Sequence, residues 1–238
     1  MESIAEKIAA VTGGTRGIGR AIAERLLREG ASVAICGRTQ ESVDRAVGEL
    51  RTLGRVFGYP ADVTHLEQVQ EFFRAIDREF GGLDILVNNA GEGVFHKVAE
   101  MTPEEWRRNI DLNLNGPFYC SREALARFRN RGGGFIVNIS SLAGKNAFSG
   151  GAGYNASKFG LNGFSEAMML DHRHDNVRVA TIMPGSVDTD FAGQSDRSGD
   201  TSWMIAPADI ADVVAMVLRM PARTMVSRVE MRPSRPRK

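Results

Sequence analysis

The chain alternates between short apolar runs and longer segments whose apolar residues recur every three or four positions. Residues 7–12 form a short apolar run that ends in glycines, and Ile18, Ile22 and Leu26 follow at helical spacing. Such alternation predicts a parallel sheet with right-handed crossovers. The pattern predicts strands at 7–12, 32–37, 55–59, 84–88, 134–140, 177–183 and 225–231, and helices at 18–28, 40–53, 66–80, 103–130, 154–174 and from 207.

No linker, repeat or low-complexity segment interrupts this pattern, and 238 residues are enough to bury one large core. We therefore predict an α/β fold: a single doubly wound Rossmann-type domain over residues 1–238, with about seven parallel strands and helices on both faces of the sheet. Charged residues make up 25% and apolar residues 42%, which is ordinary for a globular protein.

Charge and cysteine content narrow the classes of partner. The net charge is +1 with mixed signs along the chain, which favours neither nucleic acid nor an anionic membrane as a partner. The first residues carry acids rather than an apolar leader, and no apolar stretch approaches 18 residues. Cys36 and Cys120 lie in apolar stretches without metal-ligand spacing, so we predict a cytoplasmic protein with no metal site.

The first predicted strand meets the first predicted helix in a glycine-rich loop, Thr12-Gly13-Gly14-Thr15-Arg16-Gly17-Ile18-Gly19. At such a junction, backbone N–H groups and the helix dipole can receive a pyrophosphate. Glycines also simply end strands, and the spacing differs from G-x-G-x-x-G. The strand, loop and helix context favours nucleotide binding.

The end of the second strand bears on the choice of cofactor. An NAD(H) site would place an acid there against the adenosine ribose, but the chain has Cys36-Gly37-Arg38. A guanidinium grips a phosphate through paired hydrogen bonds, and Arg16 adds a second cation nearby. We therefore predict NADP(H) as the cofactor, against the alternative that Arg38 is a solvated turn residue.

Tyr154 and Lys158 are one helical turn apart and share a face, and Ser141 lies thirteen residues upstream. An ammonium about 5 Å from a phenolate stabilises it by roughly 3 kcal/mol at an effective dielectric near 20. That is most of the roughly 4 kcal/mol needed to bring a tyrosine pKa near 7. A proton donor beside a serine that holds a substrate oxygen is one interpretation. A tyrosine at a core edge is the other.

The motifs Asn88-Asn89-Ala90-Gly91, Ser141, Tyr154 with Lys158, and Pro184-Gly185 follow the glycine loop in order. With them the chain resembles the short-chain dehydrogenase/reductase family in its single-domain branch, and is similar to NADPH-dependent carbonyl and 3-oxoacyl carrier-protein reductases. The resemblance implies that Tyr154 is the acid/base, Lys158 its tuner and a ribose ligand, and Ser141 the carbonyl clamp. It also implies that Asn113 holds a water in a proton relay, in preference to Asn115; Ser141 is likewise preferred to Ser140.

By the same resemblance, Asp62 and Val63 flank the adenine, and backbone near Val187 with the Thr189 hydroxyl holds the nicotinamide carboxamide. Asn89 has the alternative of a buried amide that ties adjacent strands together. The residues expected to bind the cofactor are Gly13, Thr15, Arg16, Gly17, Ile18, Gly19, Arg38, Asp62, Val63, Asn89, Ala90, Gly91, Tyr154, Lys158, Pro184, Gly185, Val187 and Thr189.

The implied function is hydride transfer between NADPH and a ketone or other small carbonyl substrate, by a homodimer or homotetramer. Alternatives are a 3-oxoacyl carrier-protein reductase, a non-catalytic NADP(H) sensor, and an epimerase or dehydratase. Substrate identity is expected to reside in residues 144–153 and in a lid over 190–206, where Gly, Ser, Asp and Thr are frequent. Phe148, Phe191 and Trp203 are either apolar walls of the substrate pocket or ordinary loop anchors.

Overall fold

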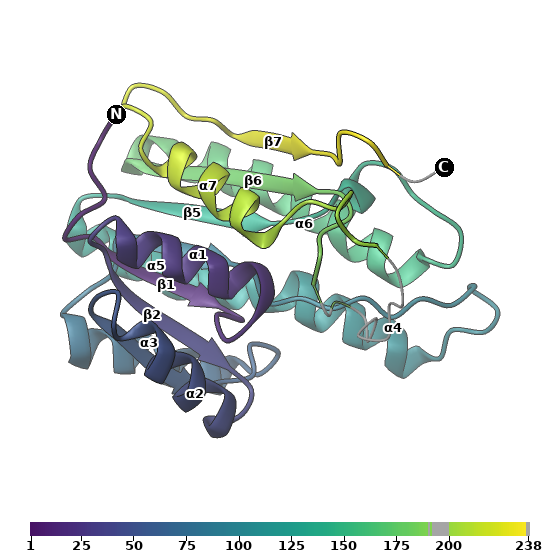
Figure 1. The fold of residues 1–238 in the computed structure, drawn as a ribbon, viewed down its shortest axis with the longest axis horizontal. Coiled ribbons are helices and arrows are strands. Elements are labelled where there is room, and N and C mark those ends of the chain that lie inside the picture. Colours follow the sequence, from purple (N-terminus) through teal and green to yellow (C-terminus); the bar gives the residue numbers. More distant parts are fainter. Residues whose placement is uncertain (190, 192–199, 237–238) are drawn as a thin grey trace.

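A parallel sheet forms the middle of the molecule (Figure 1). The computed structural model describes residues 1–189, 191 and 200–236. In this part of the chain the seven strands lie in the order β3-β2-β1-β4-β5-β6-β7, and every neighbouring pair is parallel. The strands are β1 (Ile8–Thr12), β2 (Ser32–Gly37), β3 (Val56–Pro60), β4 (Ile85–Asn88), β5 (Gly134–Ile139), β6 (Val177–Pro184) and β7 (Arg228–Met231).

Helices cover both faces of the sheet because successive strand residues point to opposite sides. In β1, Ala9 and Val11 pack on one face, against α1 (Gly17–Arg28), α2 (Gln40–Leu50) and α7 (Pro207–Leu218). Ile8 and Ala10 pack on the other face, against α3 (Leu66–Phe80), α5 (Gly116–Arg131) and α6 (Ala152–His172). The predicted doubly wound α/β fold is confirmed.

Local sequence signals set several helix ends. α4 (Pro103–Ile110) begins with a capping box between Thr102 and Glu105, with proline at its first turn. α3 and α5 both end at a glycine in the left-handed region, Gly81 with φ 81° and Gly132 with φ 76°.

The largest difference from prediction lies in the pattern over 103–130. In place of the single helix predicted there, the structure has two α-helices, α4 and α5, joined by a π-helical turn, Asp111–Asn115. The last strand is also shorter than predicted: pairing with β6 begins at Arg228, and the Val179 N–H, further back along β6, donates to the Met225 sulfur at 3.4 Å.

The topology brings four strand ends to one edge of the sheet. β1, β4, β5 and β6 are adjacent and parallel, so Thr12, Asn88, Ile139 and Pro184 end at the same side. The chain order reverses between β1 and β4, and ligands of doubly wound sheets bind beyond the carboxyl ends of the strands at such a point.

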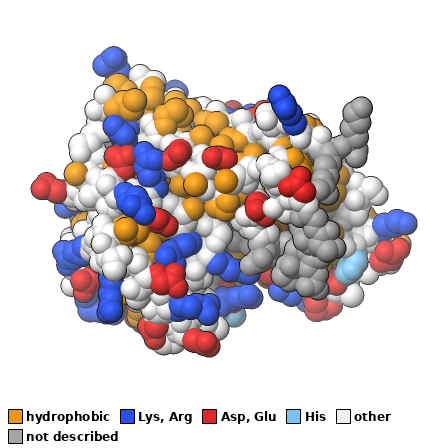
Figure 2. Space-filling model, in the orientation of Figure 1, with side chains coloured by type: hydrophobic (Ala, Val, Ile, Leu, Met, Phe, Trp, Pro, Cys, Tyr) orange, Lys and Arg blue, Asp and Glu red, His pale blue; other side chains and the backbone are white. Residues whose placement is uncertain are grey.

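The surface of the molecule bears on its partners. On the face in Figure 2, basic and acidic side chains are interspersed. Among the described residues, no helix combines the length and apolarity that a membrane span requires.

Candidate active site

A cleft of about 870 Å³ lies along the carboxyl edge of the sheet. All residues predicted as catalytic or cofactor-binding line it except Gly19 and Asn113, which are buried. The predicted lining residues are Gly13, Thr15, Arg16, Gly17, Ile18, Arg38, Asp62, Val63, Asn89, Ala90, Gly91, Ser141, Tyr154, Lys158, Pro184, Gly185, Val187 and Thr189.

The glycine loop is shaped for close approach of a ligand. Gly13 (φ 63°) and Gly17 (φ 56°) adopt left-handed backbone conformations that other residues rarely take. A Cβ at Gly19 would lie 2.3 Å from both the Gly13 carbonyl and the Asn89 amide nitrogen, so Gly19 serves packing of the loop. The first turn of α1 has no side-chain cap and no acid. Its N–H groups therefore fit an anion such as a pyrophosphate.

Arg16 and Arg38 place two cations at the same end of the cleft. Both side chains are exposed and line it, and the described residues supply neither guanidinium with an ion-pair partner. Other arginines of the chain are paired, as Arg127 is with Asp77 and Glu123. Two uncompensated guanidinium groups fit a phosphate monoester.

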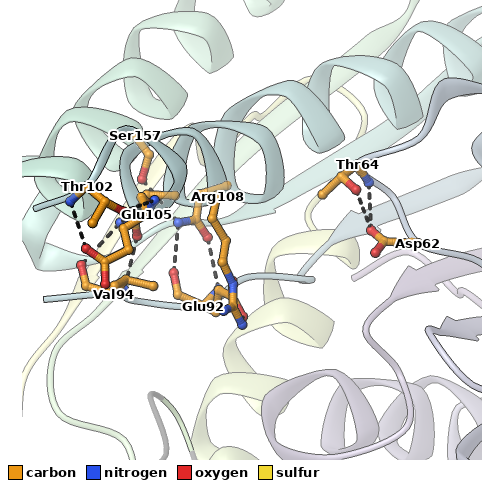
Figure 3. A network of polar contacts seen from close by, with 10 residues as sticks. Asp62, Thr64, Glu92, Val94, Thr102, Glu105, Arg108 and Ser157 are labelled. Carbon is orange, nitrogen blue, oxygen red and sulfur yellow. Dashed lines mark hydrogen bonds and ion pairs between the residues drawn. The ribbon is translucent and has the colours of Figure 1, made fainter.

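Asp62 and Asn89 both line the cleft while their side chains also hold the backbone. Asp62 Oδ1 accepts from the Thr64 backbone N–H at 3.0 Å and from its hydroxyl at 2.8 Å (Figure 3). Asn89 Nδ2 donates to the Thr12 carbonyl at 2.9 Å and the Gly13 carbonyl at 3.2 Å, which ties β4 to β1. Asn89 thus ties adjacent strands together, as its structural alternative predicts, and it also lines the cleft.

Ser141, Tyr154 and Lys158 come together at the other end of the cleft. Ser141 caps a short 3-10 turn after β5: its Oγ accepts from the Ala143 N–H at 3.1 Å and contacts the Pro184 carbonyl at 3.5 Å. Lys158 Nζ lies 5.7 Å from the centre of the Tyr154 ring and donates to the Ile139 carbonyl at 3.1 Å. The adjacent Ser140 instead donates to Asn162 at 2.7 Å.

Burial drives both titratable groups of this trio toward their neutral forms. It raises the pKa of Tyr154 to about 12, although a hydrogen bond from Ser141 partly offsets the effect. It lowers the pKa of Lys158 to about 8. The pKa of Tyr154 in the protein alone is therefore not near 7, because loss of water disfavours the charged phenolate at a buried site. Tyr154 therefore keeps its proton at neutral pH.

Asn113 lies in the π-helical turn and is fully buried. Its Nδ2 donates to the Glu92 carbonyl at 2.8 Å and to Ser157 Oγ at 3.2 Å, and its Oδ1 accepts from the Glu92 N–H at 3.1 Å (Figure 3). Ser157 Oγ in turn donates to the Tyr154 carbonyl at 2.8 Å. Asn115 points elsewhere, because its amide donates to Asp111.

The segment after Gly91 contains lining residues that sequence reasoning missed. The Phe95 ring packs edge-on against Tyr154, with ring centres 5.5 Å apart and planes at 84°. Glu92 also lines the cleft and pairs with Arg108 (Figure 3). Their signal was available, because the segment follows the carboxyl end of β4 and so begins at the site's edge of the sheet.

Of the three aromatic residues predicted as possible walls of the substrate pocket, one lines the cleft and two do not. Phe191 lines the cleft with its ring 5.7 Å from that of Tyr154, and Phe148 packs on Phe95 instead. Trp203 is not among the lining residues, whereas Thr201 and Met204 are. Positions 190 and 192–199 of the predicted lid lie outside the described residues.

The described part of the chain contains no cluster of three or more His, Cys, Asp or Glu side chains that could hold a metal ion.

Comparisons with known proteins agree with this architecture. Residues 7–199 match the family model described as short chain dehydrogenase. A 3alpha-hydroxysteroid dehydrogenase of Mediterraneibacter gnavus is 38% identical over 188 residues, which cover 78% of this chain and 75% of that protein. An uncharacterized oxidoreductase of Staphylococcus aureus is 33% identical over 98% of this chain and 100% of its own.

Two solved structures share the fold over nearly the whole chain. One is an alcohol dehydrogenase from the archaeon Thermococcus sibiricus complexed with 5-hydroxy-NADP, with a TM-score of 0.90, 30% identity, and coverage of 98% of this chain and 99% of that one. The other is a metagenomic short-chain oxidoreductase in complex with NADP, with a TM-score of 0.86, 34% identity, and coverage of 99% and 100%. The chain therefore belongs to the short-chain dehydrogenase/reductase family of oxidoreductases.

Proposed function

We propose that this enzyme reduces a ketone or other small carbonyl compound with NADPH, and that Tyr154 is the general acid. One observation carries the proposal: a single cleft joins the glycine loop and two arginines that no described residue pairs, at one end, to Ser141, Tyr154 and Lys158 at the other. NADP(H) in solved relatives of the same fold supports the choice of cofactor.

The cofactor would be held along the whole cleft. The backbone of Gly13, Thr15, Gly17 and Ile18 would face its pyrophosphate, and Arg16 with Arg38 its 2′-phosphate. Asp62 and Val63 would flank the adenine. The remaining predicted contacts, toward the active end, are Asn89, Ala90, Gly91, Tyr154, Lys158, Pro184, Gly185, Val187 and Thr189. The bound cofactor supplies the hydride; the protein orients the reactants and moves the proton.

Tyr154 is suited to protonating an oxygen on which negative charge develops. With a pKa raised to about 12, it holds its proton at neutral pH, yet it is a far stronger acid than an alcohol. Ser141 would hold the same oxygen by a hydrogen bond. Lys158, anchored on Ile139, would supply positive charge beside the phenolate that forms. The water-holding role of Asn113 stays a prediction.

The test follows NADPH oxidation over a panel of ketones in wild type and Tyr154→Phe. The variant removes one hydroxyl, so we expect unchanged NADPH affinity and a fall in kcat of about 10²- to 10⁴-fold. Retention of a tenth of the wild-type rate would contradict the assignment. NADPH binding without turnover of any carbonyl compound would indicate a sensor, and conversion without net oxidation would indicate an epimerase.

The cofactor assignment is tested in the same assay with Arg38→Asp. Loss of a charge-assisted contact corresponds to about ten- to a hundredfold weaker NADPH binding, and the new acid should improve NADH binding. Arg78→Asp, an exposed position on α3 outside the cleft, is the matched control. A wild-type preference for NADH, or an unchanged preference in Arg38→Asp, argues against NADP(H).

We also propose a homo-oligomer built on α5 and α6. These neighbouring helices expose large apolar side chains, with Phe118 45% and Phe159 46% exposed. Such side chains on adjacent surfaces favour an interface over contact with water. Light scattering should give at least twice the 26.0 kDa of one chain; a monomeric mass at micromolar concentration argues against the assembly.

A further inference from the structure

The segment that leaves the cleft floor, residues 92–95, is held by two asparagines one helical turn apart. Asn113 pairs with both backbone groups of Glu92, as described above. Asn109 does the same for Val94: its Oδ1 accepts from the Val94 N–H at 3.2 Å, and its Nδ2 donates to the Val94 carbonyl at 3.2 Å. Figure 3 shows Glu92 and Val94 turned toward this helical segment. The two side-chain amides thus pair with backbone N–H and C=O groups that a neighbouring strand would otherwise bond, and they hold residues 92–95 in place.

Asn109 also contacts the start of the catalytic helix. It is fully buried, and its Nδ2 makes a second hydrogen bond, to the Glu105 carbonyl at 3.2 Å. A Cβ at Gly153 would lie only 2.8 Å from that nitrogen, so the glycine before Tyr154 lets the amide approach α6. The side chain that holds Val94 therefore also packs closely against the backbone just before Tyr154.

The consequence of this clamp is the position of Phe95. Its ring stands edge-on to Tyr154 and lines the cleft, and Phe148 packs against it with ring centres 5.6 Å apart. A substrate carbonyl that reaches the Tyr154 hydroxyl brings its substituent near these rings. Because the backbone is held at both Glu92 and Val94, the backbone of Phe95 cannot shift far without breaking hydrogen bonds of a buried amide.

We propose that Asn109 is a positioning residue that fixes Phe95 against Tyr154, and that the pocket so formed prefers carbonyl compounds bearing an aromatic ring next to the carbonyl. An aromatic ring can pair edge-on or offset with Phe95, which a saturated ring of similar size cannot do. The proposal rests on the carbonyl reductase function proposed above.

The substrate class is tested by comparing acetophenone with cyclohexyl methyl ketone, which differ in the ring alone. With NADPH, we expect wild-type kcat/KM to favour acetophenone about three- to tenfold. Phe95→Leu keeps an apolar side chain and should bring the ratio close to one. An equal preference in wild type, or an unchanged ratio in Phe95→Leu, overturns the proposed substrate class.

The role of Asn109 is tested with Asn109→Ala. Asn115→Ala is the control, because among the described residues its amide donates to Asp111 alone, on its own helical turn. We expect Asn109→Ala to raise KM for acetophenone about tenfold and to lose the aromatic preference, with NADPH affinity and the pH profile of kcat unchanged. A merely structural role would lower the amount of folded enzyme and leave KM unchanged, which overturns the proposal.

A second variant keeps the test decisive if Asn109→Ala does not fold. Asn109→Ser retains a polar atom at the buried position. Loss of its preference for acetophenone supports the positioning role of Asn109, and a preference equal to that of wild type overturns it. Failure of the wider function is distinguishable: full turnover by Tyr154→Phe overturns the proposed acid whatever the substrate ratio. Tyr154-dependent reduction of both ketones at equal rates leaves the function standing and overturns only this inference.

Discussion

Tyr154 and Lys158 show what a spacing in the sequence can and cannot predict about a site. Their separation of four residues predicted a shared helical face, and the structure brings them together with Ser141. The spacing could not predict the ionisation of these side chains, because their removal from water depends on residues far away in the chain, such as Phe95 and Phe191. That loss moves the pKa of Tyr154 up and that of Lys158 down.

The buried lysine should leave a signature in the pH dependence of stability. Its folded pKa of about 8 lies below its ordinary value of 10.5, so the unfolded chain binds more protons between these values and stability rises with pH in that window. The shift corresponds to about 3 kcal/mol in full. We expect the free energy of unfolding of wild type, minus that of Lys158→Met, to rise by about 2 kcal/mol from pH 7 to 10.

The measurement is urea unfolding of the cofactor-free protein at several pH values. Burial also raises the pKa values of Cys36 and Cys120, so both proteins become less stable as pH rises above about 9. Taking the difference between the two proteins removes this shared contribution. The Tyr154 contribution is lost only above about pH 10. A difference that stays constant from pH 7 to 10 would show that Lys158 is not desolvated in the folded protein.

At the scale of elements, the sequence predicted what is locally encoded. Strand Ser32–Gly37 and helix Leu66–Phe80 were predicted to the residue, because an apolar pattern and its flanking turn residues lie together in the chain. The glycine loop was predicted for the same reason. The predicted cofactor contacts of Asp62, Val187 and Thr189 came instead from resemblance to a family, since no spacing rule singles them out.

The π-helical turn and residues 92–95 could not be predicted in this way. A π-turn inserts one extra residue per turn without changing the composition of the helix, and Asp111–Asn115 continues directly into α5. Residues 92–95 have no periodicity of their own; their place depends on Asn109 and Asn113, whose hydrogen bonds join segments 15 and 21 residues apart. Long-range polar contacts of this kind are absent from any local pattern.

At the scale of the whole molecule, one sheet separates two apolar cores. One core joins α1 and α7 through residues such as Leu26 and Ile210, and the other joins α3 and α5 through residues such as Ile76 and Phe128. Adjacent residues of a strand belong to different cores, so neither core can loosen without disturbing the sheet that supports the other. We therefore propose that residues 1–238 form one cooperative folding unit.

Substitutions in the two cores test this proposal. Leu26→Ala on one face and Ile76→Ala on the other each remove fully buried methyl groups, and each should lower the free energy of unfolding by about 2–5 kcal/mol. In a single unit, far-UV circular dichroism and fluorescence of Trp106 and Trp203 should shift together in both variants. Val98→Ala, at a position 78% exposed, should change stability by less than about 0.5 kcal/mol. Two separated transitions, with each variant moving only one of them, would divide the sheet into independent units.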